Sequence, residues 1–452
     1  FKNKTMRNKT LILIFSIFLL FSTGCKDFLS EKSNMKLATP NTVADNQALL
    51  DNYGFINTEF SRSGEISSDD YYLTDADYDG QSREETKRLY IWQPDHVMED
   101  ASLGNEWQSC YRAIYYSNAV LYNLEDKKLQ GADANNVKGQ ALALRAARYL
   151  DATQIWCNAY RPETADGELG LPLRLDPDMN TPSVRSTLKQ TYAQIINDLN
   201  AALPLLPVKQ VTAMRISRPA AYGLLARTYL FMGDYTKSLE NALLALQLVP
   251  NSLIDYNTID HTQEYPFTEM NKETLFWATM GYIIPVKIPL HIYQSYSEND
   301  LRNKAFFDVN NAGEVLFKGY YNNVNGPVTS VAVDELYLIA AECYARKENT
   351  TNSAMNMLNQ LLEKRWKAGT FVPLSAGSPA QALETVLKER RKELLIRGLR
   401  WPDLKRFNRD GANITLTRTV NGSNYSLPPN DLRYAIAIPE EIIGLTGIPQ
   451  NK

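Results

Sequence analysis

Aromatic side chains are the residues of this chain best suited to contact with a ligand. The sequence contains 26 Tyr and 6 Trp but only 3 His. An aromatic ring can stack on the apolar face of a sugar ring, whereas His serves acid–base and metal chemistry near neutral pH. The composition therefore favours a ligand held by ring stacking and hydrogen bonds over catalysis.

The candidate ligand-binding residues belong to two segments without helical periodicity, at 61–95 and 255–332. Asp69, Asp70 and Asn322 are the polar candidates, because their side chains can bond sugar hydroxyls. The aromatic candidates are Tyr71, Tyr72, Tyr78, Trp92, Trp277, Tyr282, Tyr296, Tyr320 and Tyr321. Each ring taken singly is more expected in the core than at a ligand, but as a group they predict some stacking contacts.

One acidic run resembles the start of a calcium-binding loop. Asp75, Asp77 and Asp79 alternate and are followed by Gly80. Such loops alternate their oxygen ligands, use Gly for the turn and end in Glu at the twelfth position. Thr86 stands at that position here. A solvated acidic loop or a ligand-contact loop is therefore the favoured interpretation, and calcium the minor one.

Catalysis and nucleic-acid binding have little support in the sequence. The motifs HExxH, GxSxG and GxxxxGK[ST] do not occur, and His96, His261 and His291 are far apart. A pair of carboxylates for glycoside cleavage stays open, because their separation is spatial. The net charge of −3, from 48 basic and 51 acidic residues, lacks the basic excess that phosphate binding requires.

The N-terminal segment has the pattern of an export signal. Lys2, Lys4, Arg7 and Lys9 precede an apolar run at 11–21, which is too short to span a bilayer. Small residues then lead to Cys25, as in a bacterial lipoprotein signal. We expect residues 1–24 to be a signal peptide and Cys25 to be lipidated; the alternative is a plain secretory peptide cut elsewhere.

The other cysteines predict neither a disulfide framework nor a zinc site. Cys110, Cys157 and Cys343 are an odd number, and no CxxC motif occurs. All three fall in apolar helical stretches. We expect them to be buried as small hydrophobic residues.

Apolar periodicity predicts mainly helices. We expect helices at 41–60, 104–124, 136–159 and 187–203, with a loop at 61–95. Residues 219–252 match the tetratricopeptide repeat, in which small residues let paired helices approach closely. A looser copy lies at 334–366. Irregular loops with a few short strands are expected at 255–332.

A strongly charged helix is expected after residue 379. It carries Glu389-Arg390-Arg391-Lys392-Glu393, and Glu389 and Glu393 share one face at helical spacing. The favoured interpretation is a salt-bridged helix that docks the C-terminal part, not a catalytic or nucleic-acid patch. Trp401 is expected to serve packing.

Four groups of residues occur in the order known from one protein family. The first is Cys25 with Lys26-Asp27-Phe28-Leu29; the second is Trp107, Tyr111, Ile114, Tyr115 and Asn118, with Gly139, Ala141, Leu142, Arg145, Ala146 and Tyr149. The third is Arg218-Pro219-Ala220, Leu225-Ala226-Arg227 and residues 335–342; the fourth runs from Glu389 to Glu393 and from Gly398 to Arg406. In these motifs the chain resembles the SusD/RagB family of Bacteroidetes surface lipoproteins. One departure is Arg397, where an acidic residue commonly precedes the Gly.

The resemblance implies a mainly α fold with a tetratricopeptide-like helix-pair scaffold. A loop-rich face that contains short strands would bind the ligand. Residues 25–452 would form one SusD-like unit. Its parts would be an N-terminal helical part at 25–254, a loop-rich insertion at 255–332 and a C-terminal part at 333–452.

The resemblance also implies a function in nutrient uptake. The protein would lie on the outer membrane, lipid-anchored and facing the cell surface, and would need no cofactor. It would bind an oligosaccharide or a peptide and deliver it to a TonB-dependent, SusC-like transporter, without being an enzyme itself. Two other interpretations stay open: a helical-repeat scaffold lipoprotein for envelope assembly, and, least favoured, a glycoside-active enzyme.

Overall fold

Two long antiparallel helices open the scaffold. The computed structural model describes residues 40–95, 105–283 and 285–451, and residues from Val43 onward form one unit. Helix α8 (Glu106–Asp126) begins at Asn105, whose side chain accepts a hydrogen bond from the backbone N–H of Gln108. Helix α9 (Ala132–Trp156) is buried over most of its length, and its alanines let neighbouring helices approach closely.

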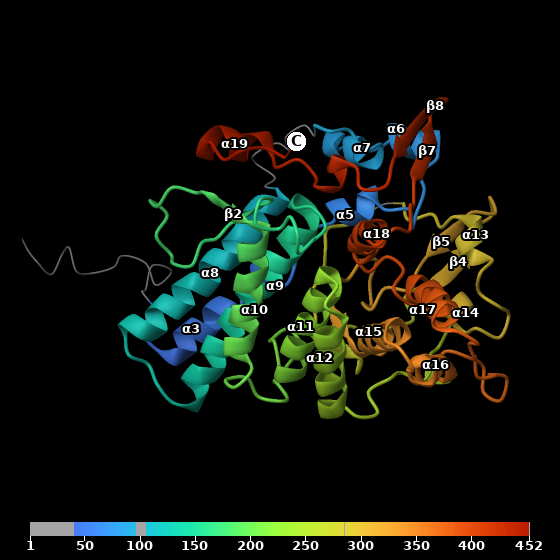
Figure 1. The fold of residues 1–452 in the computed structure, drawn as a ribbon, viewed down its shortest axis with the longest axis horizontal. Helices are drawn as coiled ribbons and strands as arrows, with labels where there is room; N and C mark the ends of the chain where they lie inside the picture. The colour runs from blue at the N-terminus through green and yellow to red at the C-terminus, as the bar shows by residue number, and fades with distance from the viewer. Residues whose placement is uncertain (1–39, 96–104, 284, 452) are drawn as a thin grey trace, which may run out of the picture. The chain divides into compact units, whose positions relative to one another are not determined.

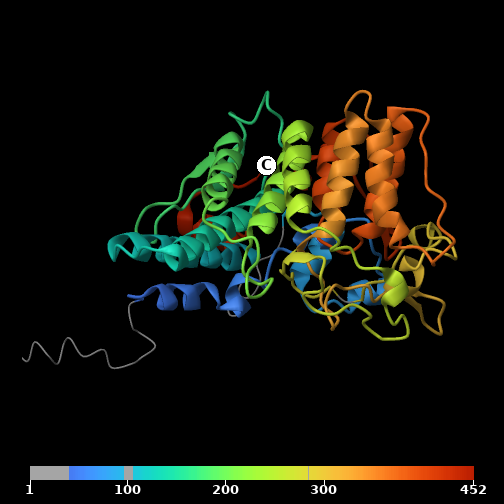
Figure 2. The ribbon, with the colours of Figure 1, turned by 90° about the horizontal axis from the view of Figure 1, so that it is seen from below.

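The long helices follow one another across the unit, each in contact with the next (Figures 1 and 2). After α3 (Val43–Leu50), α8 and α9 come α10 (Leu188–Ala202), α11 (Arg218–Met232), α12 (Tyr235–Leu248), α15 (Val333–Arg346), α16 (Thr351–Glu363) and α17 (Pro379–Glu393). This arrangement confirms the predicted mainly helical scaffold. Among the described residues, no helix is both long enough and apolar enough to cross a membrane.

Helices α11 and α12 occupy the segment that matches the tetratricopeptide pattern. Ser217 caps α11 through its side chain, and Gly233 ends it with a φ of 82°, a conformation that favours glycine. Asp234 then caps α12. Ala226 and Ala242 are completely buried, in agreement with the close approach of the two helices.

Short elements connect and cover the scaffold. The short helices are α4 (Tyr53–Ile56), α5 (Ser63–Ser67), α6 (Asp75–Asp79), α7 (Glu84–Tyr90), α13 (Leu290–Tyr293), α14 (Arg302–Phe306), α18 (Arg400–Arg409), α19 (Glu440–Thr446), and the 3₁₀ turns η3 (Tyr256–Thr258) and η4 (Leu432–Tyr434). The strands form antiparallel pairs: β1 (Leu169–Pro172) with β2 (Arg185–Thr187), β3 (Thr274–Phe276) with β6 (Val331–Ala332), β4 (Phe307–Val309) with β5 (Val315–Phe317), and β7 (Leu416–Val420) with β8 (Ser423–Leu427).

Two expectations from the sequence are wrong in detail. The single helix expected at 41–60 is two short helices, α3 and α4, separated at Asp51 and Asn52. The loop expected at 61–95 contains α5, α6 and α7. Each of these helices is so short that it shows no helical periodicity, which explains why the sequence pattern missed them.

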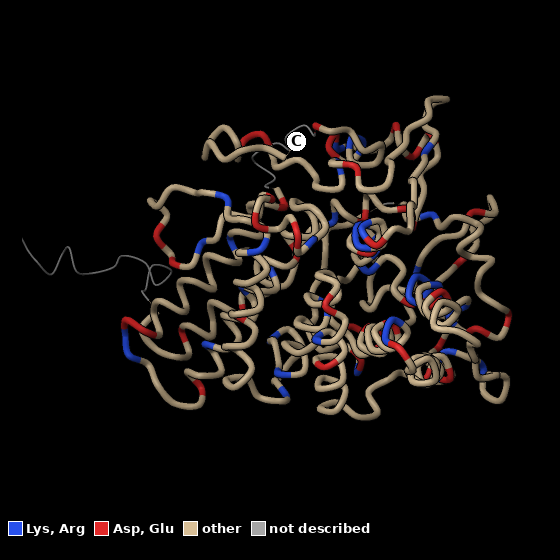
Figure 3. Tube along the Cα trace, viewed as in Figure 1, with Lys and Arg blue, Asp and Glu red and all other residues tan. Residues whose placement is uncertain are grey.

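The charged run of α17 is partly buried: Arg390 and Glu393 lie in the interior, and the other three residues are half-buried. Glu393 is bonded to Arg365 at 2.6 Å and to Arg302 at 3.0 Å, and all three side chains are fully buried. Asp300, 2.7 Å from Arg302, and Glu273, 2.9 Å from Arg365, complete the group. We call these five residues the Glu393 cluster. Figure 3 shows acidic and basic residues lying together where α17 runs.

A second buried charge group joins α15, α17 and α18. Asp403 lies 2.8 Å from both Arg390 and Arg406, and Arg406 also pairs with Glu342 at 2.5 Å. Arg397, the departure from the family pattern, pairs with Asp334 at 3.2 Å. The docking role predicted for α17 therefore holds, and its buried ion pairs reach other elements, while the pairs Glu384–Lys388 and Glu389–Lys392 run along the helix itself.

Helix α18 is also fixed to the end of α9. The ammonium group of Lys405 donates to the carbonyl oxygens of Gln154 at 2.7 Å and Cys157 at 2.5 Å. Burial lowers the pKa of Lys405 to about 8. Trp401 is 1% exposed, which confirms its predicted packing role. The three described cysteines are buried and unpaired, as expected.

Breaking the Glu393 cluster should destabilise the fold strongly. In Glu393→Gln, two buried guanidinium groups lose a shared negative charge, and we expect a loss of about 3–5 kcal/mol in the free energy of unfolding, measured by urea denaturation. The control is Glu384→Gln on the same helix, which removes an exposed pair with Lys388 and should cost at most about 1 kcal/mol. Equal losses in the two variants would contradict the buried role.

Candidate functional site

Most of the aromatic residues singled out in the sequence lie in the interior. Tyr71, Trp92, Trp277, Tyr296, Tyr320 and Tyr321 are each 6% exposed or less. Several make internal hydrogen bonds: Trp92 Nε1 donates to the Ser67 carbonyl at 2.8 Å, and the Tyr296 hydroxyl donates to the Lys392 carbonyl at 2.8 Å. Tyr72 and Tyr78 are half-buried. These rings are buried or half-buried, as the sequence predicted for each ring taken singly.

Tyr282 is the exception, because 59% of its surface is exposed. It stands at the edge of a cavity of about 260 Å³, which we call the Tyr282 pocket. The other lining residues come from the loops around α5, α6 and α7: Arg62, Ile66, Tyr71, Leu73, Gly80, Gln81, Ser82, Arg83, Thr86, and, beside Tyr282, Ile283. The structure thus brings an exposed ring of the insertion next to polar side chains of the N-terminal part.

Arg62 holds the backbone of Tyr282 at the pocket wall. Its guanidinium donates to the Tyr282 carbonyl at 3.0 Å and pairs with Glu85 at 3.2 Å. Gly281 allows this approach, because an added Cβ would meet the Arg62 side chain at 2.9 Å. Arg83 pairs with the same Glu85 at 2.5 Å. The pocket therefore presents an aromatic ring beside guanidinium and amide groups that are held in place.

Asp69 and Asp70 are used to hold the C-terminal part. Asp69 lies 2.7 Å from Arg400, and Asp70 lies 3.1 Å from Arg391. Burial works against ionisation of Asp69, but Arg400 and Arg391 more than offset it and lower its pKa. Asn322 is 6% exposed, and its amide lies near Gly326 beside Tyr282. Of the three polar candidates, Asn322 is therefore the one adjacent to the Tyr282 ring.

The acidic run at 75–79 is helix α6 and not a calcium loop. Asp77 and Thr74 cap the helix reciprocally, and Lys287 lies 2.6 Å from the Asp77 carboxylate. Asp75 and Asp79 both accept hydrogen bonds from Asn421, at 2.8 Å and 2.9 Å. Within the described ranges, no group of three or more His, Cys, Asp or Glu residues could hold a metal ion.

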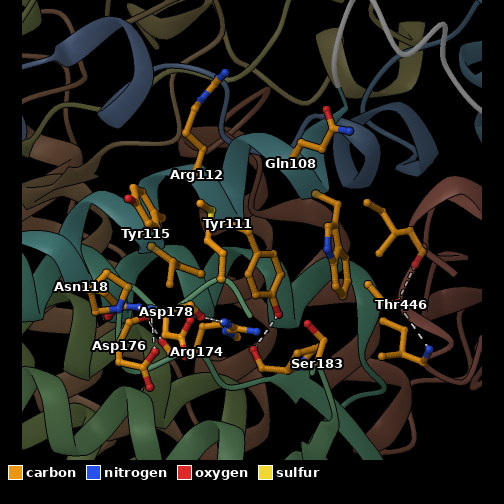
Figure 4. A pocket seen from close by; sticks show the side chains of 17 residues that line it. Gln108, Tyr111, Arg112, Tyr115, Asn118, Arg174, Asp176, Asp178, Ser183 and Thr446 are labelled. Carbon is orange, nitrogen blue, oxygen red and sulfur yellow. Dashed lines mark hydrogen bonds between the residues drawn. The ribbon is translucent and has the colours of Figure 1, made fainter. Parts of the chain in front are cut away.

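A larger cavity, of about 460 Å³, opens beside the start of α8 (Figure 4). We call it the Trp107 cavity. Its walls come from α8, from the segment 172–183 and from α19: Trp107, Gln108, Tyr111, Arg112, Ile114, Tyr115, Asn118, Pro172, Arg174, Asp176, Pro177, Asp178, Met179, Ser183, Ile442, Thr446 and Ile448. Sequence analysis placed the α8 residues among core and family motifs, because helical spacing alone does not show that a face lies open to a cavity.

Glu65, on α5, is a buried carboxyl that forms no ion pair with a basic side chain of the described residues. It is 1% exposed and accepts hydrogen bonds from the backbone N–H of Gly398 at 2.8 Å and from Ser68 at 3.2 Å. Burial, together with the nearby charge of Asp70, raises the pKa of Glu65 to about 8. In the folded protein the Glu65 side chain is therefore mainly protonated, and so uncharged, at pH 7.

Comparison with known proteins identifies the family. Residues 27–230 match the family model described as "Starch-binding associating with outer membrane", and residues 333–444 match the model of the SusD family, SusD_RagB. The chain belongs to the SusD/RagB family. The first match includes the motifs on α8 and α9, and the second includes the motifs on α15 and α17.

Relatives of this SusD/RagB chain share its length and fold. The "SusD-like protein P2" of Formosa agariphila is 25% identical, over 87% of this chain and 90% of that protein. A SusD superfamily structure from Bacteroides thetaiotaomicron has a TM-score of 0.73 at 21% identity, covering 91% of this chain and all of that one. A "putative sugar binding protein" from Bacteroides vulgatus has a TM-score of 0.72 at 20% identity, covering 92% and 99%.

Glu65→Gln should be more stable than the wild type at high pH, and the difference should grow as the pH rises. The folded pKa of about 8 lies above the ordinary value of 4.5, so the native state binds more protons between these values and loses stability with rising pH. Glu65→Gln removes this loss, and we expect a gain on the order of 2–4 kcal/mol at pH 8 and little change at pH 4. Urea denaturation at both pH values checks this. The exposed Glu125→Gln on α8 is the control, and a gain independent of pH would contradict the assignment.

Proposed function

We propose that this SusD/RagB protein captures an oligosaccharide at the Tyr282 pocket and delivers it to a TonB-dependent, SusC-like transporter in the outer membrane. The observation that carries the proposal is the exposed ring of Tyr282 beside the planar polar groups of Arg62, Gln81 and Arg83. A ring supplies a stacking platform for the apolar face of a sugar, and amide and guanidinium groups donate to its hydroxyls.

The relatives support a glycan ligand over a peptide. One family model is described as starch-binding, and structures of the same fold are named a putative sugar binding protein and a surface glycan-binding protein. The pocket volume of about 260 Å³ is small, so we expect it to hold one or two sugar units, with the rest of the chain outside. Such a site gives weak to moderate affinity.

The scaffold supports a binding role that does not include catalysis. The acidic candidates around the pocket are engaged, Glu85 with Arg62 and Arg83, and Asp77 with Lys287. A glycosidase needs one carboxylic acid and one free carboxylate on either side of the bond it cleaves. Hydrolysis would therefore belong to other proteins.

Removing the Tyr282 ring should weaken glycan binding. In Tyr282→Ala we expect affinity for soluble polysaccharides to fall about ten-fold, because the stacking platform is lost while the Arg62 contact to the backbone remains. The measurement is affinity electrophoresis or titration calorimetry with a panel of glycans and peptides. Tyr122→Ala, at a ring that is 55% exposed on α8, is the control. Loss of binding in both variants, or in neither, would count against the pocket.

The lipid anchor is proposed at Cys25, which lies outside the described residues. Acyl chains on this cysteine would hold the protein at the outer membrane. We expect Cys25→Ala to lose incorporation of an alkyne-labelled fatty acid and to leave the membrane fraction. The wild-type protein should co-purify with an outer-membrane barrel. Unchanged labelling of the variant would contradict the anchor, and a protein that binds no glycan and no barrel would favour the scaffold interpretation.

A further inference from the structure

The Trp107 cavity shares no lining residue with the Tyr282 pocket, and the proposed glycan capture leaves it unused. Its volume of about 460 Å³ lies in the range of roughly 300–1,000 Å³ that is typical of small-molecule sites. The start of α8 is fixed to a residue of the pocket wall, because Glu106 accepts a hydrogen bond from the backbone N–H of Arg62 at 3.1 Å. The chain therefore carries two separate cavities on connected parts of the fold.

Hydrogen bonds between α8 and the segment 172–183 fix two walls of the cavity relative to each other. The Tyr111 hydroxyl donates to the Pro172 carbonyl at 2.8 Å, and the Asn118 amide donates to the Arg174 carbonyl at 2.9 Å. A ligand therefore meets walls that are already in place, and it need not order them at a cost in free energy.

One face of α8 gives the cavity its aromatic surface. Tyr111 and Tyr115 line it from successive turns of the helix, and 40% of the Tyr115 surface is exposed. Ile442 and Ile448 contribute aliphatic surface from α19 and the segment after it. Such walls suit the apolar C–H face of a sugar ring, which can stack on an aromatic side chain.

Three neutral polar side chains of the lining have no hydrogen-bond partner among the described residues. They are the amide of Gln108 and the hydroxyls of Tyr115 and Ser183. In Figure 4 the ring of Tyr111 lies between Gln108 and Tyr115. Each of the three groups can both donate and accept a hydrogen bond, as a sugar hydroxyl can. A purely apolar ligand would remove water from these groups without replacing its hydrogen bonds, which costs free energy.

The charges at the rim favour a neutral ligand. Arg112 is paired with Glu59 at 2.5 Å, and Arg174 donates to two backbone carbonyls. Hydrogen bonds from Asn180 lower the pKa of Asp178, so this carboxylate of the lining is negatively charged at neutral pH. An anionic sugar would meet this charge, and it would have to compete for guanidinium groups that are already bonded.

We propose that the Trp107 cavity is a second saccharide-binding site and that its ligand is a neutral glycan. A sugar ring packs on Tyr115, and the sugar hydroxyls exchange hydrogen bonds with Gln108, Tyr115 and Ser183. The choice of a glycan over a peptide rests on the proposed function, whereas the site itself is separate from the Tyr282 pocket. A polysaccharide that fills both sites is held at two places, which raises its apparent affinity.

The test isolates the cavity in the Tyr282→Ala background, which lacks the ring of the first site. Titration calorimetry with maltohexaose, cellohexaose, xylohexaose and mannohexaose should show saturable binding of at least one of them. Adding Tyr115→Ala should weaken this binding about ten-fold, because the stacking surface is lost. Adding Gln108→Ala should weaken it roughly two- to ten-fold, because its hydrogen bonds are lost. Tyr122→Ala, at an exposed ring of the same helix outside the cavity, should leave it unchanged.

Hexagalacturonic acid tests the predicted preference for a neutral ligand. At low ionic strength and neutral pH it should bind the Tyr282→Ala protein several-fold more weakly than the neutral hexasaccharide that binds, because the carboxylate of Asp178 repels it. The difference should shrink as salt is added. Binding of the acid as tight as that of the neutral glycan would contradict the neutral ligand.

Three further results would overturn the second site. They are no binding of any neutral hexasaccharide at millimolar concentration, binding that neither Tyr115→Ala nor Gln108→Ala weakens, and a peptide that binds at the cavity in place of the glycans. Melting temperatures check that each variant is folded. Glycan binding that Tyr282→Ala removes completely would support the Tyr282 pocket and refute the second site. Binding that only Tyr115→Ala and Gln108→Ala weaken would refute the pocket and support the second site.

Discussion

The Glu393 cluster is the interaction on which the rest of this structure depends. Its five charged side chains come from the insertion, from the residues just after α16 and from the end of α17. Their carboxylates and guanidinium groups are bonded to each other and buried. Charges in such surroundings are tolerated only as a complete set, because a missing partner leaves an uncompensated charge inside the protein. The cluster therefore ties a loop-rich segment to the helical scaffold in one arrangement.

The same requirement explains why the irregular segments can form binding sites. An insertion with few regular elements would otherwise have many conformations, and a ligand would have to order it at a cost in free energy. Here Lys287 holds the insertion to α6, and Arg62 holds the backbone of Tyr282. Polar contacts between distant segments, more than hydrophobic periodicity, keep the backbone of Tyr282 beside its polar neighbours.

The two cavities differ because different elements meet at each. At the Tyr282 pocket, short helices end in polar turns whose side chains face a single exposed ring. At the Trp107 cavity, one long helix turns its aromatic stripe toward a segment whose polar groups are bonded to its own backbone.

The sequence by itself determined the long helices, the paired repeat at 219–252, the burial of the cysteines and the family. Each of these follows from local spacing: apolar residues repeat along a helix, small residues meet where helices pair, and the family motifs are short and ordered. It also showed that ring stacking was the available chemistry. The short helices α5, α6 and α7 were missed, because five to seven residues are too few to show a helical period.

Only the tertiary structure decided which rings face solvent. Tyr282 and Tyr321 look alike in sequence, yet one is 59% exposed and the other 2%. Likewise, the types of Asp69 and Asp70 suit contact with sugar hydroxyls. In the structure, both pair with arginines of the C-terminal part, more than 320 positions away in the sequence. Exposure and charge pairing depend on contacts between distant segments, and no local pattern of residue types records those contacts.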